Sequence, residues 1–323
     1  MIASRPSHAS GAFVSTLLAL GMIAGCSSQA APAASPTATP SPSARPSPSP
    51  TPRPTPAPTP VPLDQGLLNR RLTVMVIGND SNPDRASRGM FVRTDSIMVV
   101  SVNTTHTRIS MVSLPRDTVD IPLGNGGVWR DKVNGIQTTL GVQAMKRAMA
   151  ATLGVPIDYY VEVNMPDFGG IVSAVGGVDV VNPYPLYDPP LDLSLPAGRV
   201  HLDGNGAARY VRTRDQDSDF ARAGRQQQVL LALVAKLVNP KTKSDLVALL
   251  SSLHSLRTDL PLAKLRTLRE IAVRSGRAKV TRVVLAPPQF SFFAGIEPNS
   301  PRGWIIIPNI AAIQAYVRSV MTG

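Results

Sequence analysis

Cysteine and histidine are scarce in this 323-residue chain, which has one cysteine, Cys26, and four scattered histidines. A single thiol excludes an intrachain disulfide framework, and its N-terminal position leaves a folded domain without a thiol nucleophile. The histidines show no spacing typical of a metal site; they are His8, His106, His201 and His254. Acidic residues are also few, 21 Asp and Glu against 33 Lys and Arg, so the formal net charge is +12.

A hydrophobic run long enough to span a bilayer is absent as well. The apolar run at residues 12–24 has about 13 residues, whereas a spanning helix needs about 20. It follows Arg5 and ends in the sequence IAGC at 23–26, as in an export signal whose end resembles the lipobox of bacterial lipoproteins. In such proteins the cysteine is lipidated and becomes the mature N-terminus. We therefore predict a lipoprotein signal peptide over residues 1–25. An ordinary signal peptide with an incidental cysteine is the alternative.

The lipobox predicts a location outside the cytoplasm, as a bacterial lipoprotein held at the membrane by the lipid on Cys26. An exported protein does not meet nucleic acid in the cytoplasm, and aromatic residues, 5% of the chain, do not alternate with the arginines. A nucleic-acid partner is therefore not expected. Most basic residues are arginines, whose fixed fork of donors suits phosphate or carboxylate. A GC-rich coding sequence would produce the same excess.

Residues 26–62 contain the lipidated cysteine and a low-complexity tract of Pro, Ser, Thr and Ala, with 13 of the 31 prolines after residue 30. Large apolar residues are missing from this tract before Val61, so it cannot bury enough surface to fold. We predict an extended stalk of about 3.1 Å per residue between the anchor and the domain. A proline-rich ligand for a partner domain is the alternative, which the irregular repeats disfavour.

From residue 63 onward, β-branched runs alternate with amphipathic segments, as in an α/β domain. Strands are predicted at residues 72–77, 95–103, 108–114, 159–163, 178–181, 279–285 and 304–307. Helices are predicted at residues 137–153, 166–175, 206–211, 221–238, 244–253, 262–275 and 310–321. A hairpin-like connection is expected at 103–107 and a proline-containing loop at 182–200. Without a second linker, these elements predict a single domain over residues 63–323.

Arginine and aspartate recur at the ends of the predicted strands, where α/β sheets usually bind ligands. Six stretches carry most of this chemical information: GNDS at 78–81, RTDS at 93–96, SLPRD at 113–117, DKVN at 131–134, IDYYVEVN at 157–164 and YVRTRDQDSDFARAGRQQ at 210–227. In this order and at these intervals they resemble the LytR–CpsA–Psr family of bacterial cell-envelope proteins. The resemblance covers about residues 70–240.

The resemblance implies a mixed central β-sheet flanked by helices, with an apolar cavity that holds a polyprenyl chain. It also implies a phosphotransferase that attaches a glycopolymer from a polyprenyl-pyrophosphate carrier to peptidoglycan and releases polyprenyl phosphate. The carrier-linked glycopolymer and peptidoglycan are then the partners. Older descriptions of the family as transcriptional attenuators do not fit an exported protein. Most members have an N-terminal transmembrane helix, from which this chain departs by its lipobox.

Transfer at a pyrophosphate concentrates negative charge on phosphate oxygens, so it requires preorganised positive charge and a divalent cation. Arginines suit the oxygens, and aspartates suit Mg²⁺. The resemblance assigns Asp80 and Asp95 to Mg²⁺, with Mn²⁺ as the alternative. It gives catalytic roles to Arg116, Arg212, Arg214, Asp219 and Arg222. It gives substrate-binding roles to Arg93, Lys132, Arg225 and Gln226.

Several choices stay open at this point. The general base is either Asp219 or a metal-ligating aspartate, although a loose transition state needs little base assistance. Asp117 and Asp120 are interpreted as turn or ion-pair residues. Six apolar residues either line the lipid cavity or, as we favour, form ordinary core: Phe168, Ile171, Val175, Val229, Leu230 and Leu233. Two other functions would use the same residues, a hydrolase of polyprenyl pyrophosphate and a non-catalytic envelope-binding protein.

Overall fold

The structure is a computed structural model that describes residues 62–80, 93–242, 256–298 and 300–322. For Asp80 and Arg93 it describes the backbone alone. The predicted signal peptide, Cys26, most of the predicted stalk and the predicted helix 244–253 lie outside the described residues. Within the described ranges, none of the helices combines the length and the hydropathy that crossing a bilayer requires.

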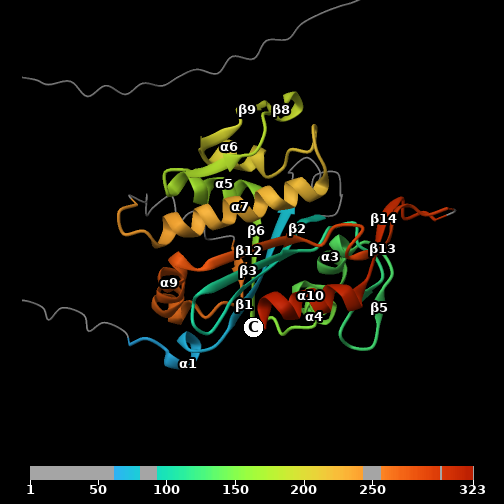
Figure 1. The fold of residues 1–323 in the computed structure, drawn as a ribbon, viewed down its shortest axis with the longest axis horizontal. Helices are drawn as coiled ribbons and strands as arrows, with labels where there is room; N and C mark the ends of the chain where they lie inside the picture. Colours follow the sequence, from blue (N-terminus) through green and yellow to red (C-terminus); the bar gives the residue numbers. More distant parts are fainter. Residues whose placement is uncertain (1–61, 81–92, 243–255, 299, 323) are drawn as a thin grey trace, which may run out of the picture. The chain divides into compact units, whose positions relative to one another are not determined.

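A mixed sheet of six strands forms the centre of the fold, as predicted (Figure 1). In spatial order the strands are β11 (Arg257–Thr258), β6 (Tyr159–Asn164), β1 (Leu72–Asp80), β2 (Arg93–Val102), β3 (Arg108–Ser113) and β12 (Lys279–Val284). β2 and β3 pair antiparallel, which confirms the hairpin-like connection between them. β1, β3, β6 and β12 run in one direction, whereas β2 and β11 run in the other. The ends of β1 and β3 therefore lie at the same edge of the sheet as the beginning of β2.

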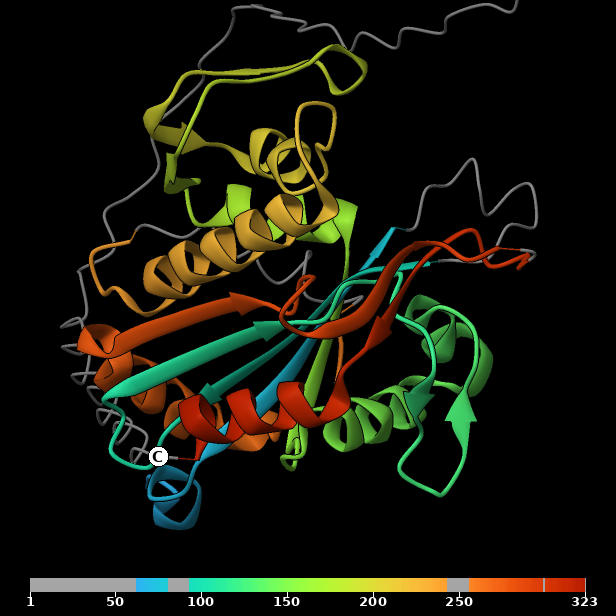
Figure 2. The same cartoon turned by 45° about the vertical axis from the view of Figure 1, so that its right-hand side comes forward.

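One face of the sheet is covered by α4 (Val142–Leu153) and α10 (Ile310–Met321), with the short α3 (Ile136–Leu140) beside them (Figure 2). Alternate residues of β1 and β2 point to this face because side chains of a strand alternate between its two sides. Met75, Ile77 and Val99 are fully buried there, in one core with Met149 of α4 and Val317 of α10. This cluster is the main hydrophobic core.

The opposite face of the sheet is covered by α7 (Asp219–Val238) and α9 (Leu265–Arg274), and α1 (Gln65–Leu68) packs on α9. The buried Gln227 amide of α7 donates to the Ser113 hydroxyl at 2.9 Å and to the Val283 carbonyl at 2.8 Å. These two hydrogen bonds fasten α7 across β3 and β12. The sheet therefore lies between two helical layers (Figure 2).

A smaller layer packs on the side of α7 that faces away from β12 (Figure 2). It consists of α5 (Met165–Ala174), β7 (Val178–Asn182), β8 (Leu186–Asp188), the 3-10 turn η2 (Pro189–Leu191), β9 (Leu193–Leu195), β10 (Gly198–Leu202) and α6 (Gly204–Tyr210). Ile171, Val175, Val229 and Leu233 belong to its core, and Phe168 packs against them. The core interpretation is thus confirmed for these four buried residues, whereas Leu230 is only partly buried and is not a member of this cluster.

Two glycines explain features that helical periodicity alone does not predict. The predicted helix 137–153 is wrong as a single element, because Gly141 adopts φ +86° and divides it into α3 and α4. Only glycine takes this backbone conformation without a steric cost. α5 and α6 approach each other at Gly204, where an added Cβ would lie 2.1 Å from the Gly169 carbonyl oxygen.

One further prediction differs from the structure, and one strand was not predicted. The predicted loop 182–200 contains β8, η2, β9 and the beginning of β10, which pairs with β7. β13 (Ser291–Ile296), which pairs antiparallel with β14 (Trp304–Pro308), is not predicted, because its residues are mostly exposed and show no alternation. The remaining short elements are β4 (Ile121–Pro122), β5 (Val128–Trp129), η1 (Val133–Gly135), η3 (Leu262–Lys264) and η4 (Ser275–Arg277).

Candidate active site

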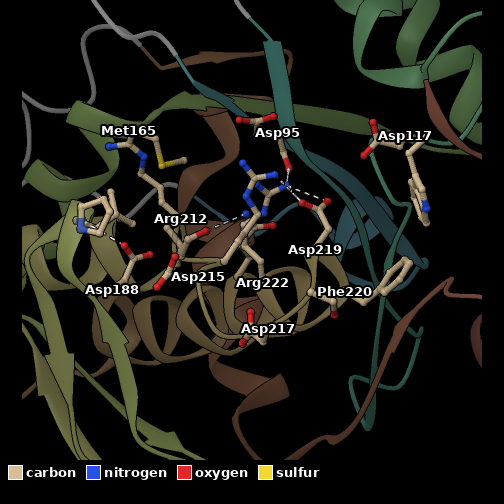
Figure 3. A pocket seen from close by; sticks show the side chains of 17 residues that line it. Asp95, Asp117, Met165, Asp188, Arg212, Asp215, Asp217, Asp219, Phe220 and Arg222 are labelled. Carbon is tan, nitrogen blue, oxygen red and sulfur yellow. Dashed lines mark hydrogen bonds and ion pairs between the residues drawn. The ribbon is translucent and has the colours of Figure 1, made fainter. Parts of the chain in front are cut away.

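Three chain segments meet at the sheet edge where β3 ends: the beginning of β2, the turn after β3, and the loop between α6 and α7. They surround a pocket of about 680 Å³ (Figure 3). Its charged lining residues are Asp95, Asp117, Asp188, Arg212, Arg214, Asp215, Asp217, Asp219 and Arg222. Its other lining residues are Met165, Pro190, Leu191, Val211, Ser218, Phe220, Gln226 and Trp304.

Arg116 lies at the centre of a charge network beside this pocket. Its terminal nitrogen is 2.5 Å from Asp95 Oδ1, and its Nε is 3.6 Å from Asp117 and 3.8 Å from Asp219. Burial by itself lowers the pKa of Arg116, but the charge and hydrogen bond of Asp95, and then the charges of Asp219 and Asp117, raise it above its usual value. Three carboxylates thus hold a permanent cation in one position.

Asp219 and Arg222 come from the first turn of α7. The Ser218 hydroxyl accepts a hydrogen bond from the Ala221 amide at 3.2 Å, so the helix begins at Asp219. The i,i+3 spacing then brings the Arg222 guanidinium 3.0 Å from the Asp219 carboxylate. Arg222 also donates to the backbone carbonyl of Asp95 at 3.1 Å. Figure 3 shows both side chains extending from the helix toward Asp95.

Two buried nitrogens of this network, Nε of Arg116 and Nε of Arg222, have no hydrogen-bond partner within the described residues. Burial lowers the pKa of Arg222, the charge of Asp219 offsets part of this effect, and the Arg116 cation adds to the lowering. Leaving a buried donor unpaired costs about 1–3 kcal/mol. A bound anion would reduce the repulsion between the two cations. The network is therefore suited to an anionic ligand.

The loop between α6 and α7 presents Arg212 and Arg214 on its exposed side. Val211 and Thr213 are buried, whereas Arg212 and Arg214 are exposed. The amides of Arg212 and Thr213 both donate to the Arg209 carbonyl, so the loop begins with a turn that continues from α6. The Arg214 guanidinium lies 3.3 Å from Asp219 Oδ1, which connects the loop to the start of α7. Both arginines line the pocket.

Arg225 and Gln226 of α7 hold this loop in place. Arg225 is buried, forms an ion pair with Asp217 and donates to the carbonyl oxygen of Thr213. Gln226 donates to the Val211 carbonyl at 3.2 Å and also lines the pocket. Arg225, in contrast, is not among the residues that line the pocket. Its guanidinium stabilises the conformation of the loop that carries Arg212 and Arg214.

The structure brings most of the predicted site residues together. Six of them line the pocket: Asp95, Arg212, Arg214, Asp219, Arg222 and Gln226. Arg116 joins them through its ion pairs with Asp95 and Asp219. Lys132 lines a neighbouring pocket and reaches the network through Asp117, 2.7 Å from its Nζ. The backbones of Asp80 and Arg93 pair across β1 and β2, so the expected neighbouring strands are found. The side chains of these two residues, like Cys26, lie outside the described part of the chain.

Some residues of the site have no place in the sequence-based prediction. Asp188 accepts a hydrogen bond from the Thr213 hydroxyl at 2.6 Å, and Asp217 pairs with Arg225. The alternating aspartates at 215, 217 and 219 are the sequence signal that more than one carboxylate contacts this loop. Phe220 and Trp304 form an aromatic wall, with ring centroids 6.5 Å apart. Trp304 comes from a strand distant in sequence, so no local pattern relates it to the site.

Within the described residues, no group of three or more His, Cys, Asp or Glu side chains is arranged to hold a metal ion. Asp95 presents one carboxylate at the pocket wall, with its Oδ1 bound to Arg116. The end of β1, which carries Asp80, lies beside the beginning of β2. Mg²⁺ usually takes only one or two carboxylates and completes its shell with phosphate oxygens and water. This donor set therefore fits Mg²⁺ shared with a phosphate ligand better than an all-protein site.

Comparison with known sequences gives relatives that share one name. The chain is 36% identical over 167 residues to a protein of Bacillus cereus (strain AH820) named polyisoprenyl-teichoic acid–peptidoglycan teichoic acid transferase TagU, covering 51% of this chain and 52% of that protein. A protein of the same name from Halalkalibacterium halodurans is 33% identical over 194 residues, or 59% and 61% of the two chains. The chain thus spans about half the length of the curated relatives it matches.

Solved structures share the fold at lower identity. TagV of B. subtilis superposes with a TM-score of 0.62 at 23% identity, over 79% of this chain and 98% of that chain. TagT bound to LIIa-WTA gives a TM-score of 0.61 at 20% identity, over 80% and 93%. The LytR_cpsA_psr family model matches residues 52–289. With that match over most of its length, this chain belongs to the LytR_cpsA_psr family.

Proposed function

We propose that this chain transfers a glycopolymer from a polyprenyl-pyrophosphate carrier to peptidoglycan and releases polyprenyl phosphate. Family membership and the names of the TagU relatives support this reaction class. The observation that carries the proposal is the set of arginines that line a pocket of about 680 Å³, Arg212, Arg214 and Arg222, with Arg116 held beside them by its ion pairs with Asp95 and Asp219. Such donors match the non-bridging oxygens of a pyrophosphate.

In this proposal the arginines stabilise the charge that develops during transfer. Arg116 and Arg222 are held by surrounding groups before the ligand arrives, so little reorganisation is needed when charge builds up on the leaving phosphate. Arg212 and Arg214 contact phosphate oxygens from the exposed side of the pocket. Asp219, bound by Arg214 and Arg222, orients both guanidinium groups.

The remaining predicted residues take supporting roles. We assign Arg93 and Lys132 to the charge around the phosphates, Lys132 through its ion pair with Asp117. Gln226 fixes the Val211 carbonyl at the pocket wall. Arg225 positions the α6–α7 loop and does not itself contact the substrate, because its donors bind Asp217 and the carbonyls of Tyr210 and Thr213.

We further propose that Asp95 and Asp80 hold Mg²⁺ together with the pyrophosphate, with Mn²⁺ as an alternative ion. When bound, the ion neutralises part of the charge on the phosphate oxygens. Asp95 fits this role because Arg116 occupies Oδ1, which leaves Oδ2 for a second partner. Arg116 and the ion would then share one carboxylate.

The carrier lipid and the anchor complete the proposal. The apolar wall formed by Met165, Leu191, Val211, Phe220 and Trp304 offers the polyprenyl chain a surface next to the phosphates. Lipidation of Cys26 would hold the domain on the outer side of the membrane, where both carrier and peptidoglycan are found. The proline-rich stalk would set its distance from that membrane.

The decisive experiment is incubation of the purified domain with a polyprenyl-pyrophosphate oligosaccharide, with and without soluble peptidoglycan fragments. Transfer predicts equal amounts of released polyprenyl phosphate and glycan-linked peptidoglycan, and little release without the acceptor. Release at the same rate without acceptor would instead identify a hydrolase. Binding of the donor with no turnover under either condition would identify a non-catalytic envelope-binding protein.

A further inference from the structure

A second pocket, of about 500 Å³, opens on the other side of the Arg116 network. The residues that line it include Trp129, Lys132, Asn134, Thr138, Thr139 and Arg302. Asp117 lines both this pocket and the candidate active site. The two cavities therefore meet at one carboxylate, which follows directly after Arg116 in the chain.

The cations of this second pocket are already neutralised by acidic partners. Lys132 Nζ lies 2.7 Å from Asp117, and Arg302 lies 2.5 Å from Glu297. Arg116, which forms part of its wall, lies 2.5 Å from Asp95. A phosphate would have to compete with these ion pairs. The cations of the second pocket are thus paired, as Arg116, Arg214 and Arg222 are at the first pocket.

Apart from Asp131, the other lining groups are neutral and suit a sugar. Trp129 provides an aromatic ring, which its indole N–H fixes by donating to the Lys132 carbonyl at 2.9 Å. Asn134 contributes an amide and Thr139 a hydroxyl, and neither side chain has a hydrogen bond to another described residue. Pockets that bind small neutral ligands combine apolar surface with a few such polar groups.

From this arrangement we propose that the second pocket binds the acceptor sugar of peptidoglycan and that Asp117 contacts the hydroxyl that reacts. This inference rests on the proposed transfer function. Phosphoryl transfer requires the entering and leaving oxygens to lie roughly in line on opposite sides of phosphorus. A donor phosphate beside Arg116 would meet an acceptor from the second pocket on the side away from the first.

The acceptor oxygen forms a bond to the phosphorus that carries the glycopolymer, while the bond from this phosphorus to the bridging oxygen breaks and polyprenyl phosphate leaves. The hydroxyl proton passes to Asp117. Oδ1 of Asp117 is bound to Lys132, but Oδ2 lies 3.6 Å from Arg116 Nε, longer than a hydrogen bond, so Oδ2 is positioned to accept it.

The first test places a large side chain in the second pocket. Thr139 and Leu140 are neighbouring exposed residues of α3, but only Thr139 lines the second pocket. Thr139→Trp should raise the KM for soluble peptidoglycan fragments at least tenfold and leave the Kd for the lipid-pyrophosphate donor unchanged. Leu140→Trp should change neither constant. An equal effect of both substitutions on acceptor KM, or an effect of Thr139→Trp on donor Kd, would overturn the acceptor site.

The second test concerns Asp117. Asp117→Asn should lower kcat at saturating acceptor at least a hundredfold, with donor Kd within twofold of wild type. Unchanged kcat would remove Asp117 from the reaction, and a loss of donor binding would assign it to the donor pocket. If the wild-type protein transfers nothing to peptidoglycan, the proposed function fails. If it transfers while both variants behave as wild type, only the acceptor site fails.

Discussion

The Arg222 guanidinium donates to the backbone carbonyl of Asp95 at 3.1 Å, which joins the first turn of α7 to the beginning of β2. A neutral carbonyl satisfies one N–H without neutralising the cation. Arg222 therefore keeps its charge for Asp219 and for a ligand, while its position relative to the sheet is fixed. Arg116 is held nearby by the side chain of the same Asp95. One residue of β2 thus orients both Arg116 and Arg222.

The exposed arginines of the α6–α7 loop provide the first prediction. Arg212→Ala and Arg214→Ala should each reduce transfer at least tenfold, about 1.4 kcal/mol of transition-state stabilisation, because each removes a donor to developing phosphate charge. Lysine at either position should restore only part of the rate, since it lacks the bidentate fork. Initial rates with the lipid-pyrophosphate donor would measure this. Arg274→Ala, an exposed arginine of α9, is the control; normal turnover by both loop variants would remove the loop from the site.

Arg225 should matter for stability. Its ion pair with Asp217 has side chains only 6% and 10% exposed, and removing one partner of such a pair costs about 3–5 kcal/mol. Arg225→Ala should therefore lower the free energy of unfolding by about that amount in urea denaturation. Arg209→Ala breaks the exposed pair with Asp192 and should cost at most about 1 kcal/mol. Equal losses in the two variants would contradict the loop-positioning role.

Metal binding should depend on the phosphate ligand. Calorimetry should detect little Mg²⁺ uptake by the free protein and clear uptake in the presence of pyrophosphate, because two carboxylates alone make an incomplete shell. Asp95→Asn should abolish the pyrophosphate-dependent uptake, whereas Glu270→Gln on α9 should leave it unchanged. Identical uptake by wild type and Asp95→Asn would exclude Asp95 as a ligand.

The anchor is tested by Cys26→Ala. Without the thiol there is no site for the lipid, so the variant should leave the membrane fraction or retain an uncleaved signal peptide. Membrane fractionation with an N-terminal mass measurement distinguishes these outcomes from wild type. Lipoprotein anchoring is disproved if the variant is processed and membrane-bound to the same extent as the wild-type protein.

Two glycine-to-alanine substitutions should change the free energy of unfolding in opposite directions. Gly141→Ala should lower the free energy of unfolding by about 1–2 kcal/mol, because alanine is strained at φ +86°. Gly224→Ala, within α7 and without neighbouring atoms at the Cβ position, should raise it by about 1 kcal/mol. Thermal unfolding of the two variants against wild type would decide this. A stabilising Gly141→Ala would contradict the broken helix.

The local sequence was sufficient for most of the secondary structure and for the family. The β-branched runs around Ile77, Val99 and Val112 predict strands of the sheet, because burial on a pleated surface selects such residues. The end of α4 at Gly154 is also local, since its left-handed backbone conformation follows from the residue type. The order of the arginine and aspartate motifs was enough to indicate the family.

Only the tertiary structure decided which of those charges meet. Arg222 and Arg225 stand three residues apart on α7, yet one reaches the pocket network and the other is enclosed by the α6–α7 loop. Asp117, predicted as a turn or ion-pair residue, lies in a turn and pairs with Lys132 and Arg116, which confirms that prediction, but it also lines two pockets. These outcomes depend on where α7 docks on the sheet and on the strand register, which are set by burying side chains distant in sequence. Local patterns carry no information about such contacts, so the chemistry of each charged residue follows from packing.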